Sequence, residues 1–198
     1  MMNSDQQDTA PRQATILQAV IAGFDELSQQ LEPARINELV NKCYEIYSAV
    51  ISLYGGTIDH FTGREAMALF GIPDPIDKAP HKAVGAALDL VNKIAELNRE
   101  TELPVPIGIK IGINTGPVTI EKIGKDKQAR EMVMGETVSM VSRICDIADS
   151  GQILVGQETY ESAKDRYEFL VMEPMPVKGS KKPLPLFELK GRKRIAPA

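Results

Sequence analysis

The sequence predicts an α/β (α+β) fold in which helices pack on a mixed, mostly antiparallel sheet. Residues 55–71, GGTIDHFTGREAMALFG, place two short apolar runs on either side of Gly63-Arg64-Glu65, which is the pattern of a β-hairpin. Apolar residues recur every three or four positions over Pro33–Leu53 and Lys82–Asn98, as in amphipathic helices. Residues 107–123 alternate as in a strand. Hairpin and crossover connections therefore occur in one chain, which indicates a mixed sheet.

The other elements follow from shorter patterns. An apolar run at 13–21 predicts a buried strand, and 25–30 predicts a short helix. The later elements are strand 131–134, helix 136–148, strand 153–155, helix 157–163, and a closing strand pair at 167–171 and 184–189. Thr115-Gly116-Pro117 marks an expected bend or bulge. We expect a disordered leader at 1–12, one domain at 13–189, and a basic tail or linker at 190–198.

Strand alternation makes a specific prediction for the hairpin. Side chains of successive strand residues point to opposite faces. Ile58, His60 and Thr62 are therefore expected on one face, and Asp59 and Phe61 on the other.

Composition bounds the class of protein. A chain of 198 residues with 43% hydrophobic content fits one domain with a single core. A net charge of −4 argues against a nucleic-acid partner. No apolar run reaches the roughly 18 residues of a membrane span, and the polar first residues are unlike a signal peptide, so we expect a cytoplasmic protein. Cys43 and Cys145 have no metal-ligand spacing and are expected in the core.

Several segments together resemble the class III adenylate and guanylate cyclase catalytic domain family. They are ATILQAVIAGFDELS, the hairpin, IGIKIGINTGPV, VMGETVSMVSRI, GQILVGQETY and the closing KGSKKPLPLFEL, in the order and spacing of the family. The resemblance implies the ferredoxin-like, palm-type cyclase fold. It also implies active sites at the interface of two such domains, so a homodimer or a heterodimer with another cyclase-type domain is expected.

Family members cyclise a nucleoside triphosphate with two divalent metals that two aspartates hold. The family pattern D-I-x-G-F-T reads here from Val20 to Asp25, so an aliphatic side chain stands at the first metal aspartate. The pattern K-x-I-G-D reads from His60 to Arg64, so a cation stands at the second. The resemblance therefore implies a degenerate member with no metal ligands at these two positions.

The remaining functional positions of the family also map onto this chain. His60 stands at the base-selecting lysine, Met132 at the base-selecting Asp or Thr, and Ser139 at the asparagine. Arg143 is the one retained position, the transition-state arginine. The loop that would contact phosphates is Ile21, Ala22, Gly23 and Phe24.

Three functions remain open at this stage. The first is a catalytically inactive signalling or regulatory dimerisation module, a pseudo-cyclase that needs no cofactor. The second is an active cyclase making cAMP or cGMP with Mg²⁺ or Mn²⁺, alone or as a heterodimer half that lends Arg143. The third is a metal-free sensor that binds a nucleotide weakly, or another anion, through Arg64, Arg143 and the loop amides from Ile21 to Phe24, since a guanidinium pairs with phosphate. The sequence does not choose between ATP and GTP.

Individual residues keep alternatives as well. Arg64 is either a phosphate ligand or a solvated, ion-paired side chain. His60 either contacts a base or is satisfied by a polar neighbour. Arg143 either pairs with Asp146 or Glu136 or points into a dimer groove. The dimer contact is expected to use a face of the hairpin and an arm at 125–132.

Overall fold

A computed structural model describes residues 10–124, 130–176 and 183–194 of the chain. This part forms one eight-stranded sheet with the strand order β2-β3-β1-β4-β6-β8-β7, and β5 pairs with β4. The strands are β1 (Arg12–Ala22), β2 (Thr57–Phe61), β3 (Glu65–Phe70), β4 (Gly108–Ile123), β5 (Arg130–Met134), β6 (Ile153–Val155), β7 (Tyr167–Val171) and β8 (Phe187–Arg192). Among the described strands only β4 and β6 pair in parallel, so the predicted mixed, mostly antiparallel sheet is confirmed.

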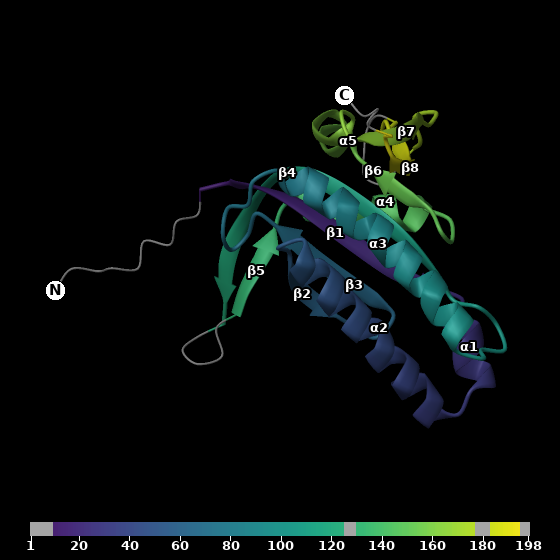
Figure 1. Cartoon of the computed structure of the whole chain (residues 1–198). Helices are drawn as coiled ribbons and strands as arrows, with labels where there is room; N and C mark the ends of the chain where they lie inside the picture. Colours follow the sequence, from purple (N-terminus) through teal and green to yellow (C-terminus); the bar gives the residue numbers. More distant parts are fainter. Residues whose placement is uncertain (1–9, 125–129, 177–182, 195–198) are drawn as a thin grey trace.

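Five helices connect these strands in the described part of the chain. They are α1 (Phe24–Gln30), α2 (Pro33–Leu53), α3 (Ala79–Glu100), α4 (Glu136–Ile147) and α5 (Gln157–Ala163). The long helices α2 and α3 lie side by side over β1 and β3, and α4 packs against the sheet beside β4 and β1 (Figure 1). None of the described helices is long and apolar enough to cross a membrane.

Strand β1 lies between β3 and β4 in the sheet and has two different faces. Leu17, Ala19 and Ile21 are at most 3% exposed and belong to the main core, together with apolar residues of α2 and α3. Ile16 belongs to a second cluster that includes Val141 of α4. Because residues two apart share a strand face, the even-numbered positions of β1 face α4 and the odd-numbered ones face α2 and α3.

The hairpin differs from the prediction in the orientation of one residue. The register shifts between Ile58 and His60, which makes Asp59 a β-bulge. Phe61 consequently packs on the main core together with Ile58, with its ring centroid 5.1 Å from that of Tyr44 on α2. The predicted assignment of Ile58 and Phe61 to opposite faces was wrong, because a bulge inverts the alternation after it.

Other boundaries also moved. Helix α3 begins at Ala79 and not at 82, because its Pro80 fits a first helical turn. The expected bulge at 115–117 is wrong for the β1–β4 ladder, where Thr115, Gly116 and Pro117 keep an unbroken register. Strand β8 occupies 187–192 and not 184–189, because Leu184 forms an isolated bridge with Met175 instead. It therefore enters the segment expected to be a tail.

Both cysteines are in the expected place. Cys43 on α2 and Cys145 on α4 are free and fully buried. Their predicted role as small apolar core residues is confirmed.

Candidate functional site

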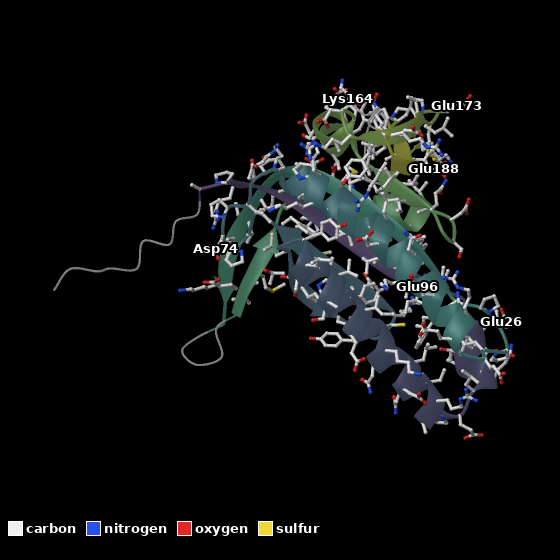
Figure 2. The ribbon with its side chains drawn as sticks, in the orientation of Figure 1. Glu26, Asp74, Glu96, Lys164, Glu173 and Glu188 are labelled. Carbon is white, nitrogen blue, oxygen red and sulfur yellow. The ribbon has the colours of Figure 1, made fainter. Side chains whose placement is uncertain are left out.

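A cavity of about 600 Å³ opens where β1 leaves the sheet. Its walls come from the loop after β1, the tip of the β2–β3 hairpin, strand β4 and the C-terminal end of α4. Glu26, which lines it, lies at the α1 end of the molecule in Figure 2. The sequence predicted that Val20, the loop from Ile21 to Phe24, and Arg64 would lie together, and all of them line this cavity.

The sheet register fixes what surrounds Val20. Its Cα lies opposite that of Glu65 on β3 and that of Lys110 on β4. Residues directly opposite each other on neighbouring strands share a face. Val20 therefore lies between a carboxylate-bearing and an ammonium-bearing residue, in a row across three strands.

Arg64 forms an ion pair at the mouth of the cavity. Its Nη1 donates to both carboxylate oxygens of Asp25, at 3.1 and 2.9 Å. Both side chains are solvent-accessible, with exposed fractions of 49% and 79%. The Ile21 amide also donates to the Arg64 carbonyl at 2.8 Å. The start of α1 is thus tied to the hairpin tip, and of the two open roles of Arg64 the structure shows the ion-paired one.

A polar network on the α4 side of β1 was not predicted. The Gln18 amide nitrogen donates to Glu65 Oε1, and the Ser142 hydroxyl donates to Gln18 Oε1 at 2.6 Å. Gln18 is only 4% exposed. The glutamine inside the apolar stretch 16–21 of β1, two positions before Val20, was the available signal. Because buried polar side chains are hydrogen-bonded, a glutamine on the face of β1 that α4 covers is expected to have a partner on that helix.

The other predicted site residues lie outside this cavity. His60 Nδ1 is 3.0 Å from Asp59 Oδ2, so a polar neighbour satisfies it. Met132 on β5 is 47% exposed, and Ser139 is exposed on α4. Arg143, also on α4, forms no ion pair with Glu136 or Asp146, both of which lie in the described part.

The residues at the implied metal positions do not fit a divalent cation. Mg²⁺ requires oxygen ligands in near-octahedral geometry. Val20 offers no donor atom, Arg64 adds a positive charge, and both Asp25 oxygens accept from Arg64. Within residues 10–124, 130–176 and 183–194, no three His, Cys, Asp or Glu side chains gather as a metal site would need.

The charge of the cavity wall opposes a bare polyanion. The acidic residues that line it are Asp25, Glu26, Glu65, Asp146 and Asp149, whereas the basic ones are Arg64 and Lys110. Lys110 lies with its Nζ 3.5 Å from the Asp146 carbonyl. A triphosphate without accompanying cations would therefore meet more negative than positive charge.

Solved structures show which class of protein has this architecture. The adenylyl cyclase CyaB from P. aeruginosa superposes with a TM-score of 0.89 at 30% identity, covering 95% of this chain and 98% of that one. The guanylate cyclase domain of RhGC from Catenaria anguillulae, solved in complex with GTP, superposes with a TM-score of 0.82 at 25% identity, covering 91% of this chain and 97% of that one. The fold is that of class III nucleotide cyclase domains.

Sequence comparison leads to the same family. The model of the adenylate and guanylate cyclase catalytic domain matches residues 7–191, so this chain belongs to that family. An adenylate cyclase of Mycobacterium tuberculosis is 29% identical over 167 residues, which cover 84% of this chain and 37% of that protein. The chain thus spans about a third of the length of the curated relatives it matches.

Proposed function

We propose that this chain is a cyclase-type domain that does not cyclise nucleotides and acts as a dimerising regulatory module in cyclic-nucleotide signalling. The Arg64–Asp25 ion pair is the observation that carries the proposal. It stands where the family places a metal-binding carboxylate, and Val20 stands at the other such position.

The energetics of the reaction support this proposal. Attack of a ribose hydroxyl on the α-phosphate requires stabilisation of the attacking and leaving oxygens, which metal ions supply at several kcal/mol. Each 1.4 kcal/mol lost is about a tenfold loss of rate. Arg64 can neutralise charge but cannot lower the pKa of a bound hydroxyl as a metal does, so anion binding alone would not restore turnover.

The direct test is turnover by the purified chain. We expect no cyclic product above a blank from ATP or GTP with either Mg²⁺ or Mn²⁺. Product made by this chain alone would overturn the proposal.

A reverted site tests the cause of the loss. The Val20→Asp/Arg64→Asp variant should acquire Mn²⁺ binding, measured by paramagnetic resonance, because it adds two carboxylates and frees Asp25. The matched control is Leu53→Asp/Arg166→Asp, which makes the same charge changes at two exposed positions outside the cavity. Equal Mn²⁺ binding by wild type, reverted variant and control would contradict the assignment of these positions.

A heterodimer half is the second candidate, and one observation favours it. Arg143 is paired with neither acidic neighbour on its helix, which leaves its guanidinium available to a partner domain. Mixing this chain with an intact cyclase domain that lacks its own arginine would then restore activity, and Arg143→Ala would abolish the rescue. Unchanged rates in the mixture would reject this candidate.

The metal-free sensor is disfavoured by the acidic cavity wall. Calorimetry with ATP, GTP and cyclic nucleotides in the presence of a chelator separates it from the main proposal. Submillimolar affinity that Arg64→Gln removes would favour the sensor, and its absence would favour the regulatory module.

Dimerisation rests on the exposed apolar residues of the β4–β5 ribbon. Ile123, Met132 and Met134 are 40–47% exposed. Of the expected arm, 125–129 lie outside the described residues. A fungal guanylyl cyclase domain of the same fold, at 22% identity, is described in both dimeric and monomeric crystal structures. Sedimentation should show a dimer that Met132→Lys dissociates, and a monomer at high concentration would count against the proposal.

A further inference from the structure

A second cavity, of about 500 Å³, lies at the other end of β1. It is lined by residues of the β1 start, the loop after β3, the start of α3, and α5. Thr15 lines it from the odd-numbered face of β1, opposite to the face that carries Gln18 and Val20. Asp74, in the loop after β3, and Glu26, at the first cavity, lie at opposite ends of the molecule in Figure 2. The two cavities are therefore separate sites.

Three buried hydroxyl groups form a chain beside this second cavity. Thr15 Oγ1 lies 3.0 Å from Thr115 Oγ1, which lies 2.8 Å from Thr159 Oγ1. The three residues are 0%, 8% and 0% exposed. Thr15 and Thr115 line the cavity, so its floor is polar although it lies deep in the fold.

The protons of these hydroxyls do not all find a partner within the described part of the chain. Each hydroxyl donates one proton, and two hydrogen bonds join three hydroxyls, so one proton is left over. If the donors run from Thr159 toward Thr15, the remaining proton is on Thr15. If both end hydroxyls donate to Thr115, it is on Thr115, and if the donors run from Thr15 toward Thr159, it is on Thr159. An acceptor atom inside the cavity would select one of the first two arrangements, because Thr15 and Thr115 line the cavity and a buried donor without a partner is costly.

The walls and rim restrict what such an acceptor belongs to. Ile76 and Ala79 contribute apolar surface, whereas Arg12 and Lys78 bring positive charge against the single carboxylate of Glu158. A volume of about 500 Å³ lies in the range of cavities that hold small molecules. An anionic group is favoured at the rim and a neutral acceptor at the floor.

We propose that this cavity binds a small organic anion whose carboxylate pairs with Arg12 and Lys78 and whose second oxygen accepts from the Thr15–Thr115 floor. A short apolar linker between the two groups would contact Ile76 and Ala79. This site is independent of the proposed function, since it shares no residue with the cavity around Val20.

Three probes separate the two interactions. We use 4-oxopentanoate, which has both groups; pentanoate, which lacks the oxo oxygen; and 4-oxopentanamide, which lacks the charge. Methyl chemical shifts of Thr15 and Thr115 in the full chain report binding. We expect 4-oxopentanoate to bind about tenfold more tightly than either analogue, as one buried hydrogen bond or one charge-assisted contact implies.

Variants assign each interaction to its residues. Thr115→Val should remove the preference for 4-oxopentanoate over pentanoate, and Thr115→Ser, which keeps the hydroxyl, should retain it. Thr119→Val, on the same strand and outside the cavity, is the control for folding. Arg12→Gln should weaken the binding of 4-oxopentanoate and pentanoate and leave the binding of 4-oxopentanamide unchanged. Arg35→Gln on α2 should not change the binding of any probe.

Two results would overturn the proposal. One is the absence of saturable shifts with all three probes at millimolar concentrations while the wild-type chain is folded. The other is a set of equal affinities for 4-oxopentanoate and pentanoate, because the hydroxyl floor would then contribute nothing. Neither result depends on whether the chain makes cyclic nucleotide.

Discussion

The two faces of β1 differ in what they contribute to the molecule. Leu17, Ala19 and Ile21 pack into the main apolar core under α2 and α3. Gln18 and Val20 face α4 and the cavity, where a hydrogen-bond network and charged groups surround them. The main apolar core thus lies on one face of β1 and the candidate site on the other. The framework therefore does not depend on a metal-binding side chain at position 20.

Removing a side chain from each face should give the largest contrast. Leu17→Ala leaves a cavity in the core and should lower the free energy of unfolding by about 3 kcal/mol. Val20→Ala, at a half-buried position beside an open cavity, should lower it by about 1 kcal/mol or less. Urea unfolding at neutral pH measures both. Equal losses would show that the cavity-facing side chain supports the fold as much as the core does.

Disrupting the hydrogen-bond network of Gln18, Glu65 and Ser142 should have the next largest effect on the free energy of unfolding. Gln18→Leu leaves the Ser142 hydroxyl and the Glu65 carboxylate without their partner and should cost about 2 kcal/mol of unfolding free energy. Adding Ser142→Ala to that variant should recover part of the loss, because one unsatisfied donor is removed with it. Purely additive losses in urea unfolding would contradict a role for the hydrogen bonds.

The two cysteines lie on opposite sides of the sheet, so the pH dependence of the unfolding free energy can be used to compare the two layers. Burial raises the pKa of the Cys43 thiol and of the Cys145 thiol from 9.0 to about 12. Because the folded pKa is raised, each contribution to stability is fully present below pH 9 and is lost as the pH rises from 9 toward 12. At pH 10 the loss should be about 1.4 kcal/mol per thiol.

Unfolding of Cys43→Ala and Cys145→Ala between pH 8 and about pH 11 tests this, within the range that these pKa values define. Each variant should show a smaller alkaline loss than the wild type. Native thiols should also react slowly with a thiolate-selective reagent at pH 8. If both variants lose as much stability at alkaline pH as the wild type, other groups cause that loss.

The sequence was sufficient for most of the fold because period and turn residues are local signals. Strand β6, helix α2 and helix α5 have the predicted bounds. The bulge at Asp59 was missed because strand alternation carries no mark of an extra residue, and the partner register that defines it lies on β3. Strand β8 was predicted to start too early because the apolar pattern reaches back to Leu184, which pairs with Met175 instead.

The site was predicted only in part, for a related reason. The resemblance placed Val20 and Arg64 together, since both belong to matched motifs. The partner of Arg64 depended on geometry: Asp25 lies 39 residues away in the chain, whereas the neighbouring Glu65 accepts from Gln18 instead. Contacts between loops and across helices are set by tertiary packing, which local patterns do not encode.

The Arg64–Asp25 ion pair should have the smallest effect on stability, although it is central to the proposed function. Exposed ion pairs contribute about 0.2 to 1 kcal/mol, because solvent screens them. A double-mutant cycle with Asp25→Ala and Arg64→Ala should give a coupling energy in that range, and it should decrease as salt is added. A coupling above about 2 kcal/mol that salt does not change would indicate a buried, structural contact. The expected small value means that opening the pair leaves the sheet folded, so a change in Mn²⁺ binding by the reverted site can be attributed to its ligands and not to unfolding.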